Sequence, residues 1–402
     1  MRVLQLTAQL DGIGGVMTYV RSLTRWLVDS GVECLVLSGD AGGLDCDARV
    51  EHAPDLASAL RRGTSPTSLL ARIDAWDPDV VLVHVFPDGV LLDSLVSAGV
   101  PAAAFVHGFI CSVGKVFRRN DTVCSHPVSP RCLWDWYAGP CGSGPSPVAA
   151  LQSHRRAVAY RAALQRAGAV VVASEFMRKY LEAEGIAADR IAVERWDPEQ
   201  TQRVLPSGEL RSAQRAQHPQ QHNVVYVGRL TYDKGVHHLI DAMTHLGTSY
   251  TLRIVGDGWY RPALQARSTR LGLGDRARFA GGKAGDALRG EYASADVVVV
   301  PSVLPEPWGL VVGEAAAAGV PVVVSDVGGL PEWQSIVPGV VTCPPASAPA
   351  LAQAIEQACS APLHGLRSGG ERPHRQSAVG PAVLVDCLRN LADTARNRSF
   401  PR

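Results

Sequence analysis

The segment Asp296–Asp326, DVVVVPSVLPEPWGLVVGEAAAAGVPVVVSD, predicts the fold of this chain. A continuous β-branched run comes first, a helical segment follows from about Leu310 to Ala318, and a second β-branched run begins at Pro321. Continuous apolar strands that alternate with helices are typical of parallel sheets covered on both faces. The segment therefore indicates a β-α-β unit of a doubly wound α/β domain.

The same alternation of short β-branched runs, glycine-containing loops and helical segments extends over most of the chain. It is interrupted at Glu194–His222, a polar stretch without a strong period, which we interpret as a connector. The 402 residues are too many for one ordinary core and suit about two domains. We expect residues 1–200 and 220–375 to form two Rossmann-like domains that face each other across a cleft, with a last helix at about 380–402 belonging to the first domain.

Composition narrows the class of protein. Apolar residues make up 46% of the chain and charged residues 19%, so both domains can fold, and the formal net charge of +1 gives no hint of a nucleic-acid partner. No run approaches the roughly 18 apolar residues of a membrane span, and the N-terminus does not resemble a secretory signal. Nine cysteines, an odd number, are consistent with a reducing compartment. We therefore expect a soluble cytoplasmic protein.

The stretch EPWGLVVGE contains two carboxylates, Glu306 and Glu314, in otherwise apolar sequence. They could be a catalytic pair, a clamp for a ligand, or acids favoured by the dipole at the start of a helix. The helix start would offer unsatisfied amides at Gly309, Leu310 and Val311, and a carboxylate beside it could accept two hydrogen bonds from a vicinal diol. Helix-dipole stabilisation explains Glu306 fairly well and Glu314 less well, so the pattern favours the clamp.

A second charged motif, RLTYDKG, follows Gly228 at the end of the strand VVYVG. Arg229 and Lys234 would converge on one anion, the first as a bidentate fork and the second as a point charge. Lys234 is one of only four lysines in the chain. The alternative is a solvated basic turn.

The predicted N-terminal domain offers two further candidates after its strands. Gly12, Gly14 and Gly15 follow the first strand, where glycines let backbone amides approach a phosphate; their pattern is not GxGxxG, and a tight turn is the alternative. His107 follows the strand AAAFV, and a histidine at a strand end is more often structural than catalytic.

Four cysteines lie in one long loop, and their spacing does not match a CxxC zinc pattern. They are Cys111, Cys124, Cys132 and Cys141. A structural zinc or iron–sulfur site and free or redox-paired thiols both remain open. Loops of this length are usually functional, so we expect this one to shape the acceptor side. The helix that follows carries Arg155, Arg156, Arg161 and Arg166, which could touch a membrane surface or an anionic acceptor, or form a solvated face.

Together these residues resemble a retaining glycosyltransferase of the GT-B fold, similar to glycosyltransferase family 4 and its glycogen-synthase-like group. The resemblance covers nearly the whole chain and is strongest from Val224 to Trp333, where GRL…KG and the acid–x7–acid spacing occur together. It implies that residues 1–200 bind the acceptor and residues 220–375 the donor, a nucleotide-diphosphate sugar and most often a UDP-sugar. The acceptor would be a hydroxyl of a small molecule, a natural product or a lipid-linked compound.

The resemblance also implies a role for each residue. Arg229 and Lys234 would hold the diphosphate, Glu314 the ribose, and Glu306 the hydroxyls of the transferred sugar. Three further sets would complete the donor site. They are the amides of Gly309, Leu310 and Val311, the loop residues Gly228 and Trp308, and, from the first domain, Gly14 and Gly15. The resemblance assigns catalysis to His107, which would face the sugar from the first domain, and to Arg229, Lys234 and Glu306. Such enzymes are generally metal-independent, since cations and a helix dipole replace the ion.

Two other functions are alternatives to this assignment, and the sequence differs from the usual family pattern at two places. A GT-B sugar-nucleotide epimerase or hydrolase, and a catalytically silent GT-B partner protein, are disfavoured by the retained charged residues. The stretch ERWDPEQ, from Glu194, stands where the family usually shows an Asn-Gly-Val-Asp-like turn, and the last helix is hard to place after Gly369.

Overall fold

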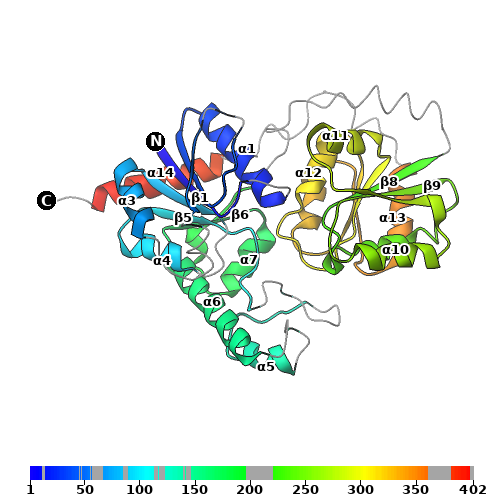
Figure 1. The fold of residues 1–402 in the computed structure, drawn as a ribbon, viewed down its shortest axis with the longest axis horizontal. Helices are drawn as coiled ribbons and strands as arrows, with labels where there is room; N and C mark the ends of the chain where they lie inside the picture. Colours follow the sequence, from blue (N-terminus) through cyan, green and yellow to red (C-terminus); the bar gives the residue numbers. More distant parts are fainter. Residues whose placement is uncertain are drawn as a thin grey trace. The chain divides into compact units, whose positions relative to one another are not determined.

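The computed structural model describes residues 1–10, 14–44, 46, 48–54, 56, 67–84, 89–112, 116, 123–138, 141, 146–195, 221–360 and 382–398. The chain divides into two compact units. The first comprises Met1–Trp196 together with Ala378–Arg402, and the second comprises Asp197–Ser377. Each unit has its own sheet and core (Figure 1).

The first unit is built on a parallel sheet of seven described strands in the order β3-β2-β1-β4-β5-β6-β7. The strands are β1 Arg2–Thr7, β2 Glu33–Ser38, β3 Arg49–His52, β4 Val80–His84, β5 Ala102–Phe105, β6 Ala169–Val172 and β7 Ile191–Val193. All residues of β4, β5 and β6 are buried, as continuous apolar runs predict for strands covered on both faces.

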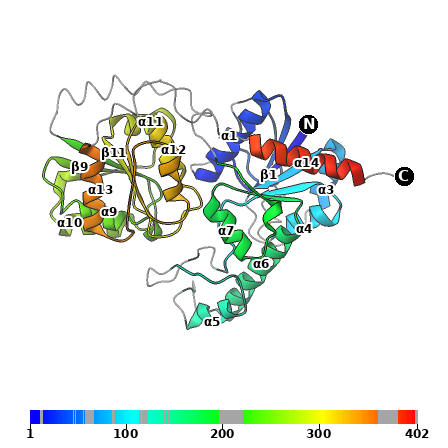
Figure 2. The ribbon, with the colours of Figure 1, turned by 180° about the vertical axis from the view of Figure 1, so that it is seen from behind.

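Helices cover both faces of this sheet. They are α1 Gly15–Asp29, α3 Thr67–Trp76, α4 Val90–Ser97, α6 Pro147–Arg166, α7 Glu175–Ala183 and α14 Ala382–Arg398, whereas α5 Arg131–Tyr137 packs on α6. Figures 1 and 2 show α1 and α14 on one face and α3, α4, α6 and α7 on the other. Ser146 and Ser174 cap α6 and α7, each accepting a backbone N–H bond from the helix's first turn.

The second unit repeats the plan with six strands in the order β10-β9-β8-β11-β12-β13. The strands are β8 His222–Val227, β9 Tyr250–Val255, β10 Ala277–Gly281, β11 Val297–Val300, β12 Val322–Ser325 and β13 Val340–Cys343. The helices are α9 Val236–Ala242, α10 Arg261–Arg270, α11 Gly285–Ser294, α12 Leu310–Ala317 and α13 Ala348–Ser360, with short 3-10 turns η3 Tyr232–Lys234 and η5 Leu330–Ser335. Figures 1 and 2 place α9, α10 and α13 on one face and α11 and α12 on the other.

The fold class predicted from the sequence is confirmed. The opening segment forms β11, α12 and β12, with β11 and β12 paired in parallel. In each sheet the strand order reverses once, between β1 and β4 in the first unit and between β8 and β11 in the second. Ligands of open α/β sheets bind beyond the carboxyl ends of the strands at such points. In the described ranges, no helix is both long and apolar enough to cross a membrane.

The last helix, α14, packs on the first unit. The buried carboxyl group of Glu194, just after β7, accepts a 2.7 Å hydrogen bond from the backbone N–H of Leu384 in the helix's first turn. Leu391 lies so close to Gly168 that a Cβ there would stand 2.4 Å from its Cδ1. Arg396 forms an ion pair with Asp79. Glu194, the first residue of the stretch interpreted as a connector, therefore holds the first turn of α14.

Candidate functional site

The loop between β8 and α9 brings a lysine against the carboxylate predicted to bind the sugar. Lys234 Nζ lies 2.8 Å from Glu306 Oε1, and the two side chains are only 20% and 15% exposed. Gly235 makes this approach possible, since its φ is +65° and a Cβ would stand 1.9 Å from the carbonyl oxygen of Pro301. Two motifs far apart in sequence thus meet at the carboxyl ends of β8 and β11.

Arg229 lies in the same loop with a different environment. Its side chain is exposed and forms no ion pair with a described residue, while its carbonyl accepts a 2.7 Å hydrogen bond from the hydroxyl of Tyr226. The loop is further held by the amide of Gly228, which donates to the carbonyl of Val255 at 3.0 Å. The backbone of Arg229 is fixed by these contacts, while the residue as a whole is exposed.

Glu306 is held through both its side chain and its backbone. The hydroxyl of Ser302 donates to Oε1, the oxygen that also faces the lysine. The carbonyl of Glu306 accepts from the amide of Gly329 at 2.7 Å. Gly328 has a φ of +64°, and a Cβ on it would lie 2.4 Å from the backbone of Glu306. The position of this carboxylate is therefore set by the loop after β12 as well as by its own loop.

The start of α12 presents backbone amides next to these charged groups. Gly309 has a φ of +88°, and a Cβ there would stand 2.4 Å from Cδ2 of Leu330. In the described part of the chain, the amides of Gly309, Leu310 and Val311 donate no hydrogen bond to another backbone or side-chain group. Helix N-termini of this kind favour anions through free N–H groups and the helix dipole.

Trp308 has a structural environment. Its side chain is 3% exposed and packs on Trp333, with ring centroids 4.4 Å apart. The indole N–H of Trp333 donates to the carbonyl of Trp308 at 2.8 Å. The buried ring fixes the loop that precedes α12, so any contact of this residue with a donor would involve its backbone.

Glu314 lies one turn into α12 and is bound on one oxygen. The hydroxyl of Tyr292, from α11, donates to Glu314 Oε2 at 2.5 Å. Burial raises the pKa of Glu314, and the hydrogen bond from Tyr292 partly offsets this rise. Among the described residues, Oε1 has no hydrogen-bond partner. One oxygen is therefore held in place while the other remains available.

The first unit places its candidates after β1 and β5. Gly15 begins α1 and Gly14 precedes it with an extended backbone, while Gly12 lies outside the described residues. The loop's earlier part is fixed by the amide of Leu10, which donates to Asp40 Oδ1 at 2.9 Å. Residues 11–13 lie outside the described residues, so the predicted phosphate contact and the tight strand-to-helix turn both stay predictions.

His107 follows β5 and lies in a buried polar chain that the sequence analysis did not identify. Its Nε2 is 3.2 Å from Nδ1 of His84, the last residue of β4. Burial lowers the pKa of His84 to about 3, and burial together with the neighbouring His84 lowers the pKa of His107. A signal for His84 was present in the sequence, because it is a polar residue at the end of the apolar run VVLVH.

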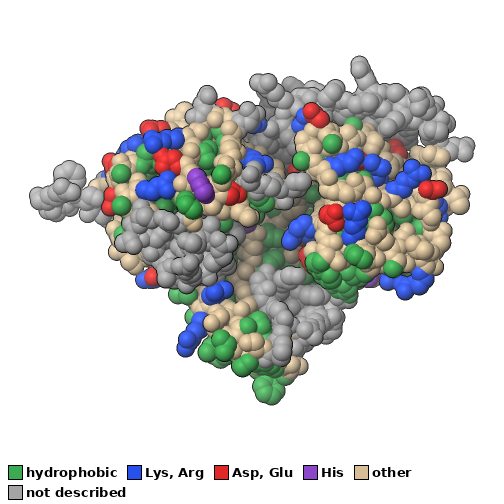
Figure 3. Space-filling model, in the orientation of Figure 1, with side chains coloured by type: hydrophobic (Ala, Val, Ile, Leu, Met, Phe, Trp, Pro, Cys, Tyr) green, Lys and Arg blue, Asp and Glu red, His purple; other side chains and the backbone are tan. Residues whose placement is uncertain are grey.

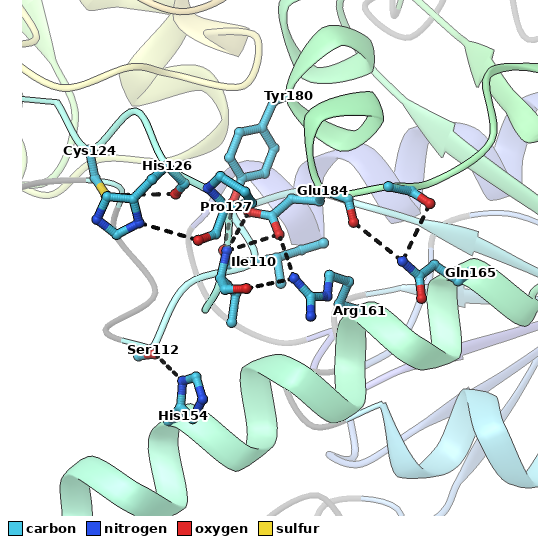
Figure 4. A network of polar contacts seen from close by, with 12 residues as sticks. Ile110, Ser112, Cys124, His126, Pro127, His154, Arg161, Gln165, Tyr180 and Glu184 are labelled. Carbon is cyan, nitrogen blue, oxygen red and sulfur yellow. Dashed lines mark hydrogen bonds and ion pairs between the residues drawn. The ribbon is translucent and has the colours of Figure 1, made fainter. Parts of the chain in front are cut away.

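The cysteine loop is held by polar side chains of α6 and α7 (Figure 4). Glu184, buried in α7's C-terminal turn, accepts from the amide of Val128 at 3.1 and 3.2 Å. Arg161 of α6 donates to the carbonyl of Val128 at 2.6 Å, and Tyr180 of α7 donates to that of Ile110 at 2.6 Å. These contacts anchor both ends of the loop's described parts.

The four loop cysteines are described, but no metal-binding cluster is found around them among the described residues. Within the described ranges, no group of three or more His, Cys, Asp or Glu side chains could hold a metal ion. Cys124 Sγ lies 3.9 Å from the carbonyl of His126, whose ring pairs with Asp135 at 2.9 Å. A structural metal site on Cys111, Cys124, Cys132 and Cys141 and the alternative of free or redox-paired thiols both stay predictions.

Comparison with known proteins adds two family matches. The family described as glycosyl transferases group 1 matches residues 210–376, and the glycosyl transferase 4-like domain matches residues 14–194. The two matches fall on the second and first units, respectively.

Individual relatives agree with these matches. The chain is 30% identical to the 2-deoxystreptamine glucosyltransferase of Streptomyces kanamyceticus over 74% of this chain and 73% of that protein. It is 48% identical to an uncharacterized glycosyltransferase of Methanocaldococcus jannaschii, over 27% of this chain and only 28% of the relative's length. In fold, it is similar to the crystal structure of Anabaena HepE in complex with UDP and glucose, with a TM-score of 0.63, 20% identity, and coverage of 99% of this chain and 95% of that one.

Proposed function

Because this chain belongs to the glycosyltransferases, with a group 1 domain, a family 4-like domain and the GT-B fold, we propose that it is a retaining enzyme using a nucleotide-diphosphate sugar. The first expected donor is a UDP-sugar. The acceptor is a hydroxyl of a small molecule, a natural product or a lipid-linked compound. One observation carries this proposal: Lys234 and Glu306 pair 2.8 Å apart beside the first amides of α12, which have no hydrogen-bond acceptor among the described residues.

In the proposed donor site, cations and amides recognise the diphosphate, and glutamates recognise the hydroxyls of the ribose and of the sugar. Lys234, Arg229 and the start of α12 bind the diphosphate and stabilise the charge that develops on it as the sugar leaves. Glu314, with one oxygen held by Tyr292 and one available, binds the ribose hydroxyls. Glu306 binds the hydroxyls of the transferred sugar. Cations and a helix dipole then perform the role of a divalent metal, so transfer is metal-independent.

The two glutamates are binding groups in this proposal. A retaining glycosidase needs one carboxylic acid that protonates the leaving group and one carboxylate that attacks the sugar. Here Glu306 is paired with Lys234, and Glu314 is hydrogen-bonded to Tyr292. These partners suit groups that hold a ligand. The proton of the acceptor hydroxyl would pass to the leaving phosphate oxygen on the same face of the sugar.

The acceptor is proposed to bind the first unit, where residues 1–200 include the loop anchored on α6 and α7. Figure 3 shows hydrophobic side chains beside Lys and Arg side chains over the end of this unit formed by α5 and α6. Trp134 and Tyr137 are 72% and 52% exposed, and Arg155 and Arg156 of α6 are exposed as well. Such a surface suits a hydroxylated ring or, weakly, a lipid surface that carries the acceptor. The relative named for a 2-deoxystreptamine acceptor supports a small molecule.

A donor screen tests the proposal. Calorimetric titration with UDP, GDP and ADP in EDTA should show binding of at least one diphosphate, with UDP tightest. A metal requirement, or no binding by any of the three, would contradict the donor assignment. We also propose a cytoplasmic location, and the odd number of cysteines supports it because it is consistent with a reducing compartment.

Product analysis separates the proposal from its alternatives. Incubation with the bound sugar nucleotide and a panel of aminocyclitol and phenolic acceptors should give a glycoside with the donor's anomeric configuration, read by proton NMR. Free sugar alone would indicate a hydrolase, an altered sugar nucleotide an epimerase, and binding without any turnover a silent partner protein.

A further inference from the structure

A continuous chain of side-chain hydrogen bonds runs from α1 through β1 and β4 to His107. The hydroxyl of Thr24 donates to the carbonyl of Val20 at 2.7 Å and accepts from Gln5 Nε2 at 2.8 Å. Gln5 Oε1 lies 2.9 Å from His84 Nε2. His84 Nδ1 lies 3.2 Å from His107 Nε2. Gln5, Thr24 and His84 are fully buried, with no exposed surface.

The donor-to-acceptor direction of this series of hydrogen bonds is fixed at Thr24, the residue farthest from His107. The carbonyl of Val20 can only accept, so the single hydroxyl proton of Thr24 points to it. Thr24 must then accept from the next residue, which requires the NH₂ end of the Gln5 amide to face it. The oxygen of Gln5 therefore faces His84, and His84 Nε2 must carry the proton that this oxygen accepts.

The same hydrogen-bond argument determines which nitrogen of His107 carries the proton. Burial lowers the pKa of both histidines, so each ring is neutral and holds one proton. With the His84 proton on Nε2, its Nδ1 can only accept. His107 must therefore donate from Nε2, and its Nδ1 is left with a lone pair. No described residue is hydrogen-bonded to that Nδ1.

Ring packing holds the orientation of His107. Phe105 stacks on it with centroids 4.4 Å apart and planes 27° from parallel, and Tyr19 meets it at 70° and 5.2 Å. A flipped imidazole would place a carbon where Nε2 faces His84. Packing and hydrogen bonding thus specify both the position of the ring and the location of its proton.

We propose that Gln5, Thr24 and His84 are positioning residues that fix His107 as the Nε2–H tautomer, so that Nδ1 accepts a hydrogen bond from a hydroxyl of the substrate. The statement about substrate rests on the proposed function; the statement about the tautomer does not. The relay makes the site selective for a sugar that carries a hydroxyl at this point. An ether or a deoxy position there could not donate and would leave the lone pair unsatisfied.

Histidine NMR tests the relay in the donor-free protein. Long-range proton–nitrogen spectra of protein labelled with ¹⁵N-histidine report which ring nitrogen carries the proton, and His107→Gln and His84→Asn assign the two signals. We expect Nε2–H for both rings. Gln5→Leu removes the acceptor of the His84 proton, so His84 can donate from Nδ1 and His107 should shift toward Nδ1–H.

A conservative pair of variants controls for folding. Thr24→Ser keeps the hydroxyl and should preserve the wild-type tautomers, whereas Thr24→Val removes the anchor and should give a mixture. The Nδ1–H form of His107 in the wild type, or unchanged tautomers in both Gln5→Leu and Thr24→Val, would overturn the relay.

Kinetics then connect the tautomer to turnover. Gln5→Leu should lower kcat about tenfold, the equivalent of one hydrogen bond, with UDP affinity unchanged. Thr24→Ser should retain wild-type kcat. If the tautomers follow expectation but no nucleoside diphosphate binds, the proposed function fails while the relay stands. If the diphosphate binds and the tautomers do not follow, the relay fails alone.

Discussion

Replacing Lys234 by alanine should weaken the binding of UDP by about 10- to 150-fold. The ammonium lies 2.8 Å from Glu306 and is only 20% exposed, so it is positioned and partly desolvated before a ligand arrives. A hydrogen bond to a charged group contributes about 1.5–3 kcal/mol, and about 1.4 kcal/mol corresponds to a factor of ten in affinity. The measurement is the calorimetric Kd for UDP.

Because Lys234 is paired with Glu306, a substitution of Glu306 should affect the binding of UDP in the opposite direction. Glu306→Gln keeps the shape of the side chain and removes a negative charge that competes with the diphosphate for Lys234. UDP should therefore bind this variant as well as the wild type or a few-fold more tightly, whereas sugar transfer should fall because a contact with the sugar hydroxyls is weakened. Opposite effects on binding and turnover distinguish a sugar contact from a general loss of structure.

Lys283 provides the matched control. It belongs to the same unit and also pairs with a glutamate, Glu291, but at α11. Lys283→Ala should change the Kd for UDP by less than about twofold, since this lysine is not among the residues proposed to contact the donor. A Lys234→Ala protein that binds UDP within about twofold of wild type, or equal losses in both variants, would refute the assignment.

Three further predictions concern the supporting structure. Tyr292→Phe removes the hydrogen bond that holds Oε2 of Glu314, so it should weaken the binding of UDP severalfold and leave the binding of inorganic diphosphate unchanged. Equal losses of affinity for both ligands in titrations would contradict the ribose role of Glu314. Gly235→Ala should lower the melting temperature and abolish UDP binding, because a Cβ would stand 1.9 Å from the carbonyl oxygen of Pro301; a wild-type melting curve would contradict this. Burial raises the pKa of Glu194 to about 8, so the folded protein keeps a proton on this side chain that the unfolded chain releases near pH 4. The stabilisation that this proton gives is complete below about pH 4. It is lost as the pH rises to about 8, at about 1.4 kcal/mol per pH unit. The stability of the wild type relative to Glu194→Gln should therefore fall from pH 5 to pH 8 in urea unfolding, and a constant difference would contradict it.

The sequence predicts the parts of this fold that depend on local pattern. The β-branched runs before Pro301 and after Pro321 form β11 and β12 because a strand buried on both faces needs continuous apolar residues. The positions of Lys234 and Glu306 after parallel strands predict that both lie at one edge of the sheet. Their direct pairing depends on Gly235 closing against Pro301, a contact between loops that no local pattern encodes.

Partners distant in sequence account for what the sequence did not predict. Trp308 is buried because Trp333 meets it from η5, and Glu194 caps a helix 190 positions later in the chain. Gln5 was visible as a polar residue within a buried strand, a signal that could have indicated the chain leading to His107. The cysteine spacing could not distinguish a metal site from a loop held by side chains such as Glu184.

The central claim is that the second unit binds a nucleoside diphosphate through its phosphates without a metal. Parallel calorimetric titrations of the wild-type protein with UDP and with uridine, both in EDTA, test it most directly. The account predicts that UDP binds and that uridine binds at least about a hundredfold more weakly, since Lys234 and the α12 amides contact only the diphosphate. Equal affinities for the two ligands, or no binding of UDP until a divalent metal is added, would contradict it.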